Sequence, residues 1–352
     1  MYKVIKIIFI LFFLSIPVIS SAETKLIKIV FLGNLADEDY DGSLVFKNYV
    51  ESHSYGKLKV EIYPGAQLCG CAIECLMALK SGIIEIYMGT AADVSAIYPP
   101  VQVLDLPYML DSNRIAEEVF NGPFLNILQK KMLEYTKVIR LMRISNTGGW
   151  RCFATTKRMI KEPNNLKGVK IRTLNSEIQI KMMKLLSANP TPVAWPELYS
   201  ALSTGVVEGS SNSITDIVGM KLHEKIKYII LDEHSYMASL WMINNKFFKN
   251  LSEDLQKIII DGFYELSDVS IALPKRRAVD AYAEFIKKGG EIYLPNNREK
   301  ALFREKVYKP LIDWYTKKYG DELFKVYDEA IKNAKSKIDN EYNIHKSLNH
   351  ID

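Results

Sequence analysis

The stretch that decides the fold is residues 166–209, LKGVKIRTLNSEIQIKMMKLLSANPTPVAWPELYSALSTGVVEG. Within it, Val169–Arg172 is a short apolar run that predicts a strand, and Ser176–Leu186 has the apolar spacing of a helix. A second helix is expected over Glu197–Ser203, and Val206–Glu208 follows as another strand. Strands that alternate with helices predict an α/β fold with a largely parallel sheet.

The same alternation extends to both sides of this stretch. The other predicted strands are Leu26–Leu32, Leu58–Tyr63, Ile83–Met88, Val138–Ile144, Tyr228–Leu231 and Tyr236–Asn244. The other predicted helices are Gly70–Lys80, a helix from Ser252 to about Lys288 that Pro274 interrupts, and Arg298–Ala334. No low-complexity linker separates the two halves, so we expect two lobes joined by several chain crossings, as in a hinged clamshell.

The composition is that of an ordinary globular protein. The chain has 352 residues, of which 48% are hydrophobic and 25% charged, with a formal net charge of +5. It is too apolar and too evenly charged for a disordered chain. A charge of this size does not indicate the concentrated basic face of a nucleic-acid binder, so we expect no nucleic-acid partner. At roughly 150 residues per domain, the length indicates two domains.

The N-terminus has the features of a secretory signal peptide. Lys3 and Lys6 precede a short apolar run, Ile7–Ile19, and the small residues that follow end at Ala22. The alternative is a membrane anchor, but at about 1.5 Å per residue this run is too short for a hydrocarbon core of roughly 30 Å. We therefore predict a signal peptide over residues 1–22 and export of the remainder.

Motifs for catalysis are absent from the sequence. We find no phosphate-binding loop, dinucleotide fingerprint, nucleophile elbow or zinc-protease helix. Asp37, Glu38, Asp39 and Asp41 lie in a turn-rich segment, residues 34–43, which we interpret as a loop. A calcium-binding loop would need a twelve-residue pattern with a Gly at its sixth position and a Glu at its last, and this complete pattern is missing. We predict that this acidic loop is solvated, with no metal and no cofactor.

Three of the four cysteines cluster at the start of the helix predicted over Gly70–Lys80. Cys69, Cys71 and Cys75 do not have the spacing of a zinc site. In an exported protein a Cys69–Cys75 disulfide is one interpretation, which leaves Cys71 and Cys152 either free or paired with each other. The alternative is that all four are small apolar core residues.

Two arginines occur in unusual local sequence. Arg151 follows Gly148, Gly149 and Trp150, and a glycine pair indicates close backbone approach at a domain crossing. Arg172 ends a predicted strand, and open α/β sheets gather ligands at the carboxyl ends of their strands. The planar guanidinium matches a carboxylate with two hydrogen bonds. The alternative role for these arginines is in surface salt bridges.

Several blocks resemble, in order and spacing, the solute-binding proteins of TRAP (tripartite ATP-independent periplasmic) transporters. They are Tyr63–Leu68, Leu104–Tyr108, Gly149–Arg151, Leu166–Arg172, Ala188–Leu202 and Gly205–Gly209. The resemblance covers about residues 25–330. It implies a two-lobed periplasmic binding protein, type II-like, with a long helix bridging both lobes. Its lobe I would comprise 23–148 and 238–277, and its lobe II 149–237 and 278–352.

The resemblance also implies a site and a function. A small organic acid would be bound by its carboxylate at Arg172, the arginine of the K-x-R motif, with Arg151 as a second cation. Trp195 would pack on the ligand, and Thr90, in the loop 89–93, would face the pocket. Asn212 would be a polar contact, and so would Asn175, three residues after Arg172. The family usually has larger polar residues where this chain has Ser210 and Ser211, which leaves the far end of the pocket open to question.

This function is capture of the acid in the periplasm by a monomer and delivery to integral-membrane transporter subunits. Two other classes stay open at this point. One is a binding protein for an ATP-driven importer or a sensor. The other is an exported α/β enzyme, because catalytic triads need not be local in sequence.

Overall fold

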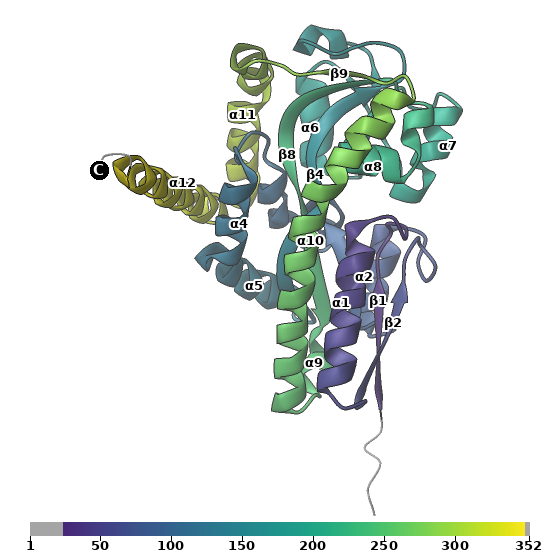
Figure 1. The fold of residues 1–352 in the computed structure, drawn as a ribbon, viewed down its shortest axis with the longest axis vertical. Helices are drawn as coiled ribbons and strands as arrows, with labels where there is room; N and C mark the ends of the chain where they lie inside the picture. The colour runs from purple at the N-terminus through teal and green to yellow at the C-terminus, as the bar shows by residue number, and fades with distance from the viewer. Residues whose placement is uncertain (1–23, 349–352) are drawn as a thin grey trace, which may run out of the picture.

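The computed structural model describes residues 24–348, so the predicted signal peptide lies outside the described residues. We call the part with β1–β3 and α1–α3 the first lobe, and the part with β5–β7 and α6–α8 the second lobe (Figure 1). The strands are β1 Lys25–Val30, β2 Leu58–Tyr63, β3 Ile86–Thr90, β4 Ile139–Thr155, β5 Lys170–Thr173, β6 Asn189–Pro192, β7 Gly209–Asn212, β8 Tyr228–Asn244 and β9 Glu291–Tyr293. They form one sheet in the order β2-β1-β3-β8-β4-β7-β5-β6, with β9 paired to β8.

The sheet is mixed rather than largely parallel. Parallel pairs occur on both sides of it, β1 with β2 and β3, and β5 with β6 and β7. At the centre, β4 and β8 are 17 residues each and pair in antiparallel fashion through both lobes. The sequence pattern predicts only the start of β4 and divides β8, because Gly148–Gly149 and the polar run Asp232–Ser235 interrupt their apolar residues. A chain that crosses between lobes and returns has to run antiparallel, which explains the mixed sheet.

The glycine pair lies where β4 passes between the lobes. The register of β4 against β8 shifts between Asn146 and Trp150, and Gly148 and Gly149 have φ of 105° and 103°. A Cβ on Gly148 would lie 2.7 Å from Asp216 Oδ1, so the backbone comes too close for a side chain. The boundaries predicted between the lobes at 148/149, 237/238 and 277/278 fall inside β4, β8 and α10. The division itself stays a prediction.

The helices differ from the predicted ones at several places. They are α1 Glu38–His53, α2 Ala72–Ser81, α3 Ala91–Val94, α4 Asn113–Asn121, α5 Pro123–Thr136, α6 Glu177–Leu185, α7 Leu198–Ser203, α8 Ile214–Gly219, α9 Asn245–Lys249, α10 Glu253–Lys287, α11 Asn297–Tyr319 and α12 Glu322–Leu348. The predicted loop 34–43 is wrong from Glu38 onward. Gly42 resembles a turn residue, but α1 packs so closely on α10 that a Cβ there would lie 2.4 Å from Ser270 Oγ.

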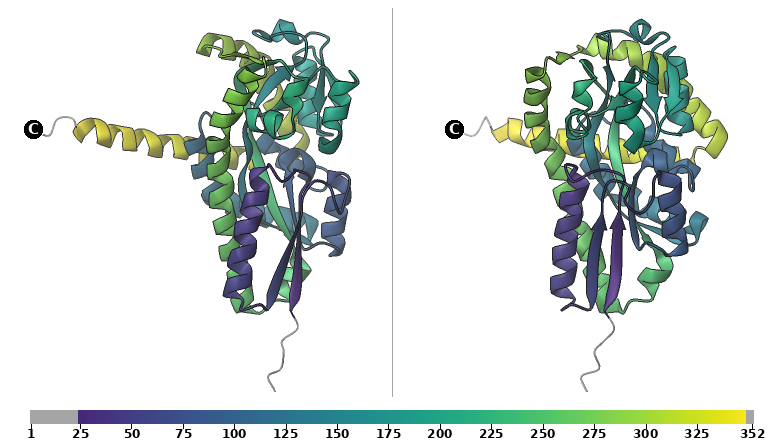
Figure 2. Two further views of the ribbon diagram at one scale, coloured as in Figure 1. Left: turned by 45° about the vertical axis from the view of Figure 1, so that its right-hand side comes forward. Right: turned by 90° about the vertical axis from the view of Figure 1, so that its right-hand side faces the viewer.

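The helices α3, α4, α5, α8 and α9 were not predicted from the sequence. Two further differences concern long helices. Pro274 does not interrupt α10, which continues through it. The single C-terminal helix predicted over Arg298–Ala334 is two helices, because Gly320 takes φ 81° between α11 and α12. The far end of α12 projects away from both lobes (Figure 2).

Helix α10 lines both lobes, as the bridging helix was predicted to do. Its first half, with Ile259 and Phe263, packs in one core with α1 and β1–β3. Its second half, with Ala281 and Phe285, packs in another core with α7 and α8. In residues 24–348, none of the helices is both long and apolar enough to cross a membrane.

Candidate ligand-binding site

A cavity lies between the two lobes, where several strands and loops end. The first lobe contributes the segment before α1, the start of α1 and the turn from β3 to α3. The second lobe contributes residues of β5, β7 and α8, and the middle of β4 adds Thr147 and Arg151. Four predicted site residues besides Arg151 line this cavity, namely Thr90, Arg172, Trp195 and Asn212. They come from positions up to 122 residues apart, so the fold assembles the site.

Arg151 is buried, with 4% of its surface exposed. Its Nη1 donates a 2.8 Å hydrogen bond to the backbone oxygen of Ser211. Its Nε has no hydrogen-bond partner among the described residues. A buried N–H of a charged group without a partner is costly, so this group is available to a ligand.

Arg172 is buried still more deeply, with 2% exposed. Its Nε donates to the backbone oxygen of Val193 at 2.9 Å, and its guanidinium lies 5.6 Å from the centroid of the Trp195 ring. Its Nη2 finds no partner within residues 24–348. Burial, and secondly the charge of Arg151, lower the pKa of Arg172 to about 9. Both guanidinium groups therefore share a desolvated space that lacks a counter-ion in direct contact.

The surface salt bridge considered for these arginines is absent from the structure. Arg151 and Arg172 make no ion pair with any residue that the structure describes, whereas most ion pairs of the chain are on its surface. The cost of burying two such charges is large unless a partner compensates it.

Thr90 and Asn212 are engaged inside the protein as well as facing the cavity. The Thr90 hydroxyl donates to Asp93 Oδ2 at 2.8 Å and caps the short helix α3. The Asn212 amide donates to Asp216 Oδ2 at 2.8 Å. Both residues thus hold a cavity carboxylate in position. Asn175 does not line this cavity: it is exposed in a neighbouring groove that shares Trp195 with it.

A disulfide joins Cys69 to Cys75 at the start of α2. Cys71 and Cys152 are free, the first half-buried and the second buried, so the alternative pairing between them does not occur. Cys71 lines the same neighbouring groove as Asn175.

Acidic residues are the part of the site that the sequence analysis missed. The prediction of a solvated acidic loop is wrong, because Glu38 and Asp39 are 3% and 1% exposed. Burial, and then the charge of Asp216, raise the pKa of Asp37 to about 7, and burial raises the pKa values of Asp39 and Asp216. Acidic residues in the first turn favour a helix start, so this signal was present in the sequence. The sequence contained no signal that these residues lie close to Asp216, which is distant along the chain.

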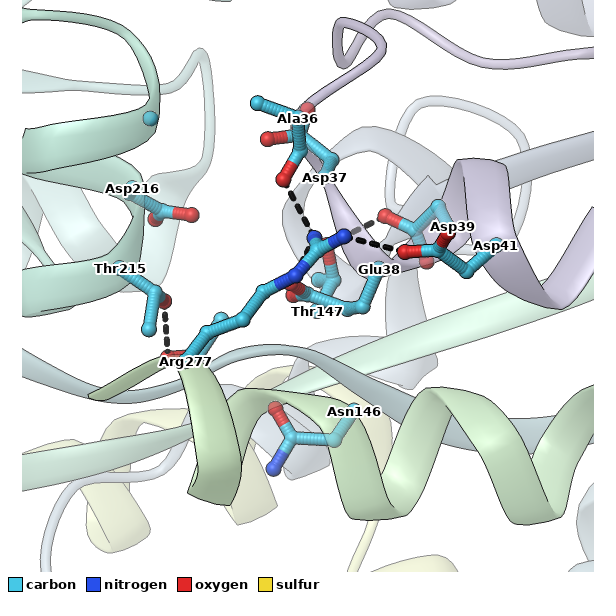
Figure 3. A network of polar contacts seen from close by, with 12 residues as sticks. Ala36, Asp37, Glu38, Asp39, Asp41, Asn146, Thr147, Thr215, Asp216 and Arg277 are labelled. Carbon is cyan, nitrogen blue, oxygen red and sulfur yellow. Dashed lines mark hydrogen bonds and ion pairs between the residues drawn. The ribbon is translucent and has the colours of Figure 1, made fainter. Parts of the chain in front are cut away.

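Arg277 of α10 is the cation beside this acidic segment. It contacts the backbone oxygen of Ala36 and the carboxylates of Glu38 and Asp41 (Figure 3). Asp216 approaches from the second lobe, on the other side of the gap, next to Thr215, whose hydroxyl donates to the Gly148 carbonyl. The lobes also touch directly where Asn34 Nδ2 donates to the Gly219 oxygen at 3.4 Å.

A buried hydrogen-bond chain supports Arg151 from behind. Ser211 Oγ lies 2.7 Å from His234 Nε2, and His234 Nδ1 lies 2.7 Å from Asp232 Oδ2. The Ser211 carbonyl is the acceptor for Arg151. The residue types are those of a hydrolase triad, but none of the three lines the cavity. The small hydroxyls of Ser210 and Ser211, which departed from the family pattern, are both bonded inside the protein.

No group of three or more His, Cys, Asp or Glu side chains in residues 24–348 is arranged to hold a metal ion.

The architecture is that of a two-lobed solute-binding protein. It has two α/β lobes, a helix and two strands that connect them, and a polar cavity between them.

The particular family follows from comparison with known proteins. The sequence model of the bacterial extracellular solute-binding proteins, family 7, matches residues 36–318, and the chain belongs to this family. It is 25% identical to the 2,3-diketo-L-gulonate-binding periplasmic protein of Escherichia coli, over 88% of this chain and 94% of that protein. It is 24% identical to the ectoine-binding periplasmic protein of Halomonas elongata, over 86% and 90%. The chain is thus a TRAP-type solute-binding protein and not an enzyme.

A solved structure agrees with this assignment. The TRAP periplasmic solute-binding protein of Desulfovibrio salexigens with bound orotic acid superposes with a TM-score of 0.83 at 26% identity. The match covers 88% of this chain and 99% of that one. The predicted fold class and family are confirmed.

Proposed function

We propose that this protein captures a small organic acid by its carboxylate and delivers it to the integral-membrane subunits of a TRAP transporter. The observation that carries the proposal is the pair Arg151 and Arg172. Both are buried at the cavity, each has an unused N–H group among the described residues, and neither has an acidic partner in direct contact. A carboxylate that accepts from these groups would compensate their burial, and such charge-assisted bonds are strong in a water-poor site.

Capture follows from the arrangement of the lobes. A ligand bound to Arg172 and Trp195 of the second lobe would also touch Thr90 and Asp39 of the first lobe. A ligand that contacts both lobes favours the closed arrangement by its differential affinity for it. The relatives named above support an acid as the ligand, since one is named for a gulonate and another holds orotic acid.

The location and partners rest on the family. We propose that residues 1–22 are removed as a signal peptide and that the mature chain acts in the periplasm, as its Escherichia coli relative's name states for that protein. The partner subunits are testable by uptake into membrane vesicles that contain them. Uptake of the acid should require this protein and should persist without ATP. ATP dependence would instead indicate an ATP-driven importer.

Binding is tested first with a panel of organic acids in a thermal-shift screen, followed by calorimetry on those that stabilise the protein. A ligand at 100 times its dissociation constant should add about 2.7 kcal/mol to the unfolding free energy. Arg172→Ala should then weaken binding by roughly 2–4 kcal/mol, and Arg172→Lys should restore only part of it because Lys lacks the planar fork. Arg158→Ala, at an exposed position, is the matched control. Wild-type affinity in Arg172→Ala would contradict the proposal.

A further inference from the structure

The cavity that we propose to bind an acid is lined by more acidic than basic side chains. Two arginines and four aspartates line it, namely Arg151, Arg172, Asp37, Asp39, Asp93 and Asp216. A ligand with only a carboxylate would add a further negative charge to this enclosed space. The surplus of acidic side chains in the cavity therefore indicates that the ligand has a second polar group besides its carboxylate.

The two kinds of charge are segregated along the cavity. Burial raises the pKa of Asp93, and the hydrogen bonds with Thr90 and then the charges of nearby Arg172 and Arg151 act against that rise. Asp37 and Asp39 belong to the first lobe, where the cation in reach is Arg277, and Arg277 is already bonded to Glu38, Asp41 and Ala36. Asp216 stands between the two ends, because its neighbours include both Arg151 and Asp37. The cavity thus has an arginine end and an acidic end, and Figure 3 shows Asp37, Asp39 and Asp216 of the acidic end.

Asp39 shows that the acidic end is incomplete without a ligand. Its side chain is buried, and one oxygen, Oδ2, accepts a 2.6 Å hydrogen bond from the Thr147 hydroxyl. The other oxygen, Oδ1, has no partner anywhere in residues 24–348, although Asp39 lines the cavity. The buried hydroxyl of Tyr87, also on the cavity wall, is likewise without a partner in the described chain. An unsatisfied buried oxygen of this kind costs free energy that a donor on the ligand would recover.

We propose that the ligand is zwitterionic, with a cationic nitrogen such as an amine or amidine that binds between Asp39, Asp37 and Asp216 while its carboxylate binds the arginines. This inference rests on the proposed function and narrows its ligand class. The acidic end lacks positive charge and hydrogen-bond donors, and a protonated nitrogen supplies both. Desolvated charge pairs of opposite sign give specificity, because a ligand without the cation leaves the aspartates unpaired.

The test compares ligands matched in length and differing in one end group. The probes are γ-aminobutyrate, δ-aminovalerate and ε-aminocaproate, set against butyrate, valerate and caproate, against succinate, glutarate and adipate, and against the polyhydroxy acid galactonate. Dissociation constants are measured by calorimetry on ligand-free protein at pH 7. We expect at least one amino acid to bind tighter than its matched acids by about tenfold or more, equivalent to about 1.4 kcal/mol.

Asp39→Asn tests the residue. The asparagine keeps the shape and can still accept from Thr147, but it removes the charge. It should abolish the preference for the amino acid over its matched monocarboxylate. Asp280→Asn, on the exposed face of α10, is the control for a general change of charge and should keep the preference. Should Asp39→Asn not fold, the ranking of the probes on wild-type protein decides alone.

The outcomes separate this inference from the proposed function. If a dicarboxylate or galactonate binds tightest and Arg172→Ala abolishes that binding, the zwitterion inference is overturned and the acid-binding function stands. An equal preference for amino acids in Asp39→Asn would also overturn it. If none of the four probe classes binds to the wild-type protein, both the inference and the acid-binding function are contradicted.

Discussion

Replacing Arg172 by methionine should make the ligand-free protein more stable while it abolishes binding. Methionine has a similar length and volume but carries no charge. In the ligand-free state, Arg172 is a buried cation next to a second buried cation, Arg151, and it has no direct acidic partner in residues 24–348. Removing a buried charge in favour of an apolar side chain of similar volume often stabilises a protein.

The magnitude follows from the pKa of Arg172. Burial lowers it from its ordinary value to about 9, and each pKa unit corresponds to about 1.4 kcal/mol of penalty on the charged form. The gross penalty is therefore on the order of several kcal/mol at pH 7. Methionine loses the hydrogen bond to the Val193 oxygen, a loss of about 1 kcal/mol, and leaves that oxygen less satisfied. We expect a net rise in the unfolding free energy of roughly 1–3 kcal/mol.

The assay is urea unfolding of protein that has been denatured, dialysed and refolded to remove any bound ligand. Arg158→Met, at an exposed position, should change stability by less than about 0.5 kcal/mol and serves as the control. Calorimetry with an identified acid should show that binding to Arg172→Met is lost. The reasoning is refuted if the ligand-free methionine variant is less stable than wild type, since Arg172 would then be a structural residue rather than one held ready for a ligand.

Three further predictions follow from the fold. Replacing Cys69 and Cys75 by serine should lower the unfolding free energy by about 2 kcal/mol, as expected for a short loop, and wild type in a reducing agent should show the same loss in urea unfolding. Gly148→Ala should lower the unfolding free energy by more than Gly205→Ala, because both glycines have positive φ but only at Gly148 would the new Cβ collide with cavity-wall atoms. Equal losses of unfolding free energy in urea would contradict the close approach of Asp216 to the Gly148 backbone. The pKa of Asp37 is raised to about 7, so the folded state binds a proton that the unfolded state has released, and stability should fall as pH rises from about 4 to 7; Asp37→Asn should flatten this part of the pH profile, and an unchanged slope would show that other groups cause it.

Local patterns were enough to predict several of the helices and strands that lie within one lobe. The predicted strand Val169–Arg172 corresponds to β5, and Leu58–Tyr63 to β2, because short apolar runs bounded by turn residues are local features. The family resemblance indicated Arg151, Arg172 and Trp195 together, and the structure places all three on one cavity. Their roles toward a ligand stay predictions.

The remainder depends on contacts that a local pattern does not contain. Gly42 reads as a turn residue, and only its packing against Ser270 shows that α1 requires it. Gly148 similarly looked like the end of a strand, so the full length of β4 was not predicted. A glycine is required there because Asp216 lies so close to the backbone. The acidic end of the cavity joins Asp39 to Asp216, and nothing in either segment alone indicates the other. Charged residues near a helix start are usually solvated, whereas Glu38 and Asp39 are buried here beside Arg277 of α10 and Thr147 of β4.

The position of α10 restricts how the protein can move. Helix α10 is unbroken and contributes residues to the hydrophobic cores of both lobes, and β4 and β8 run beside it through both lobes. Three covalent connections along one side leave little freedom to twist or to slide, so opening is confined to rotation about one axis near that side. A membrane partner that contacts both lobes would then distinguish the loaded from the empty protein by a single angle. Glycine substitutions in α10 should therefore allow the lobes to twist and slide as well as rotate. They should make the loaded and empty proteins harder for the membrane partner to tell apart before they change the affinity for the ligand.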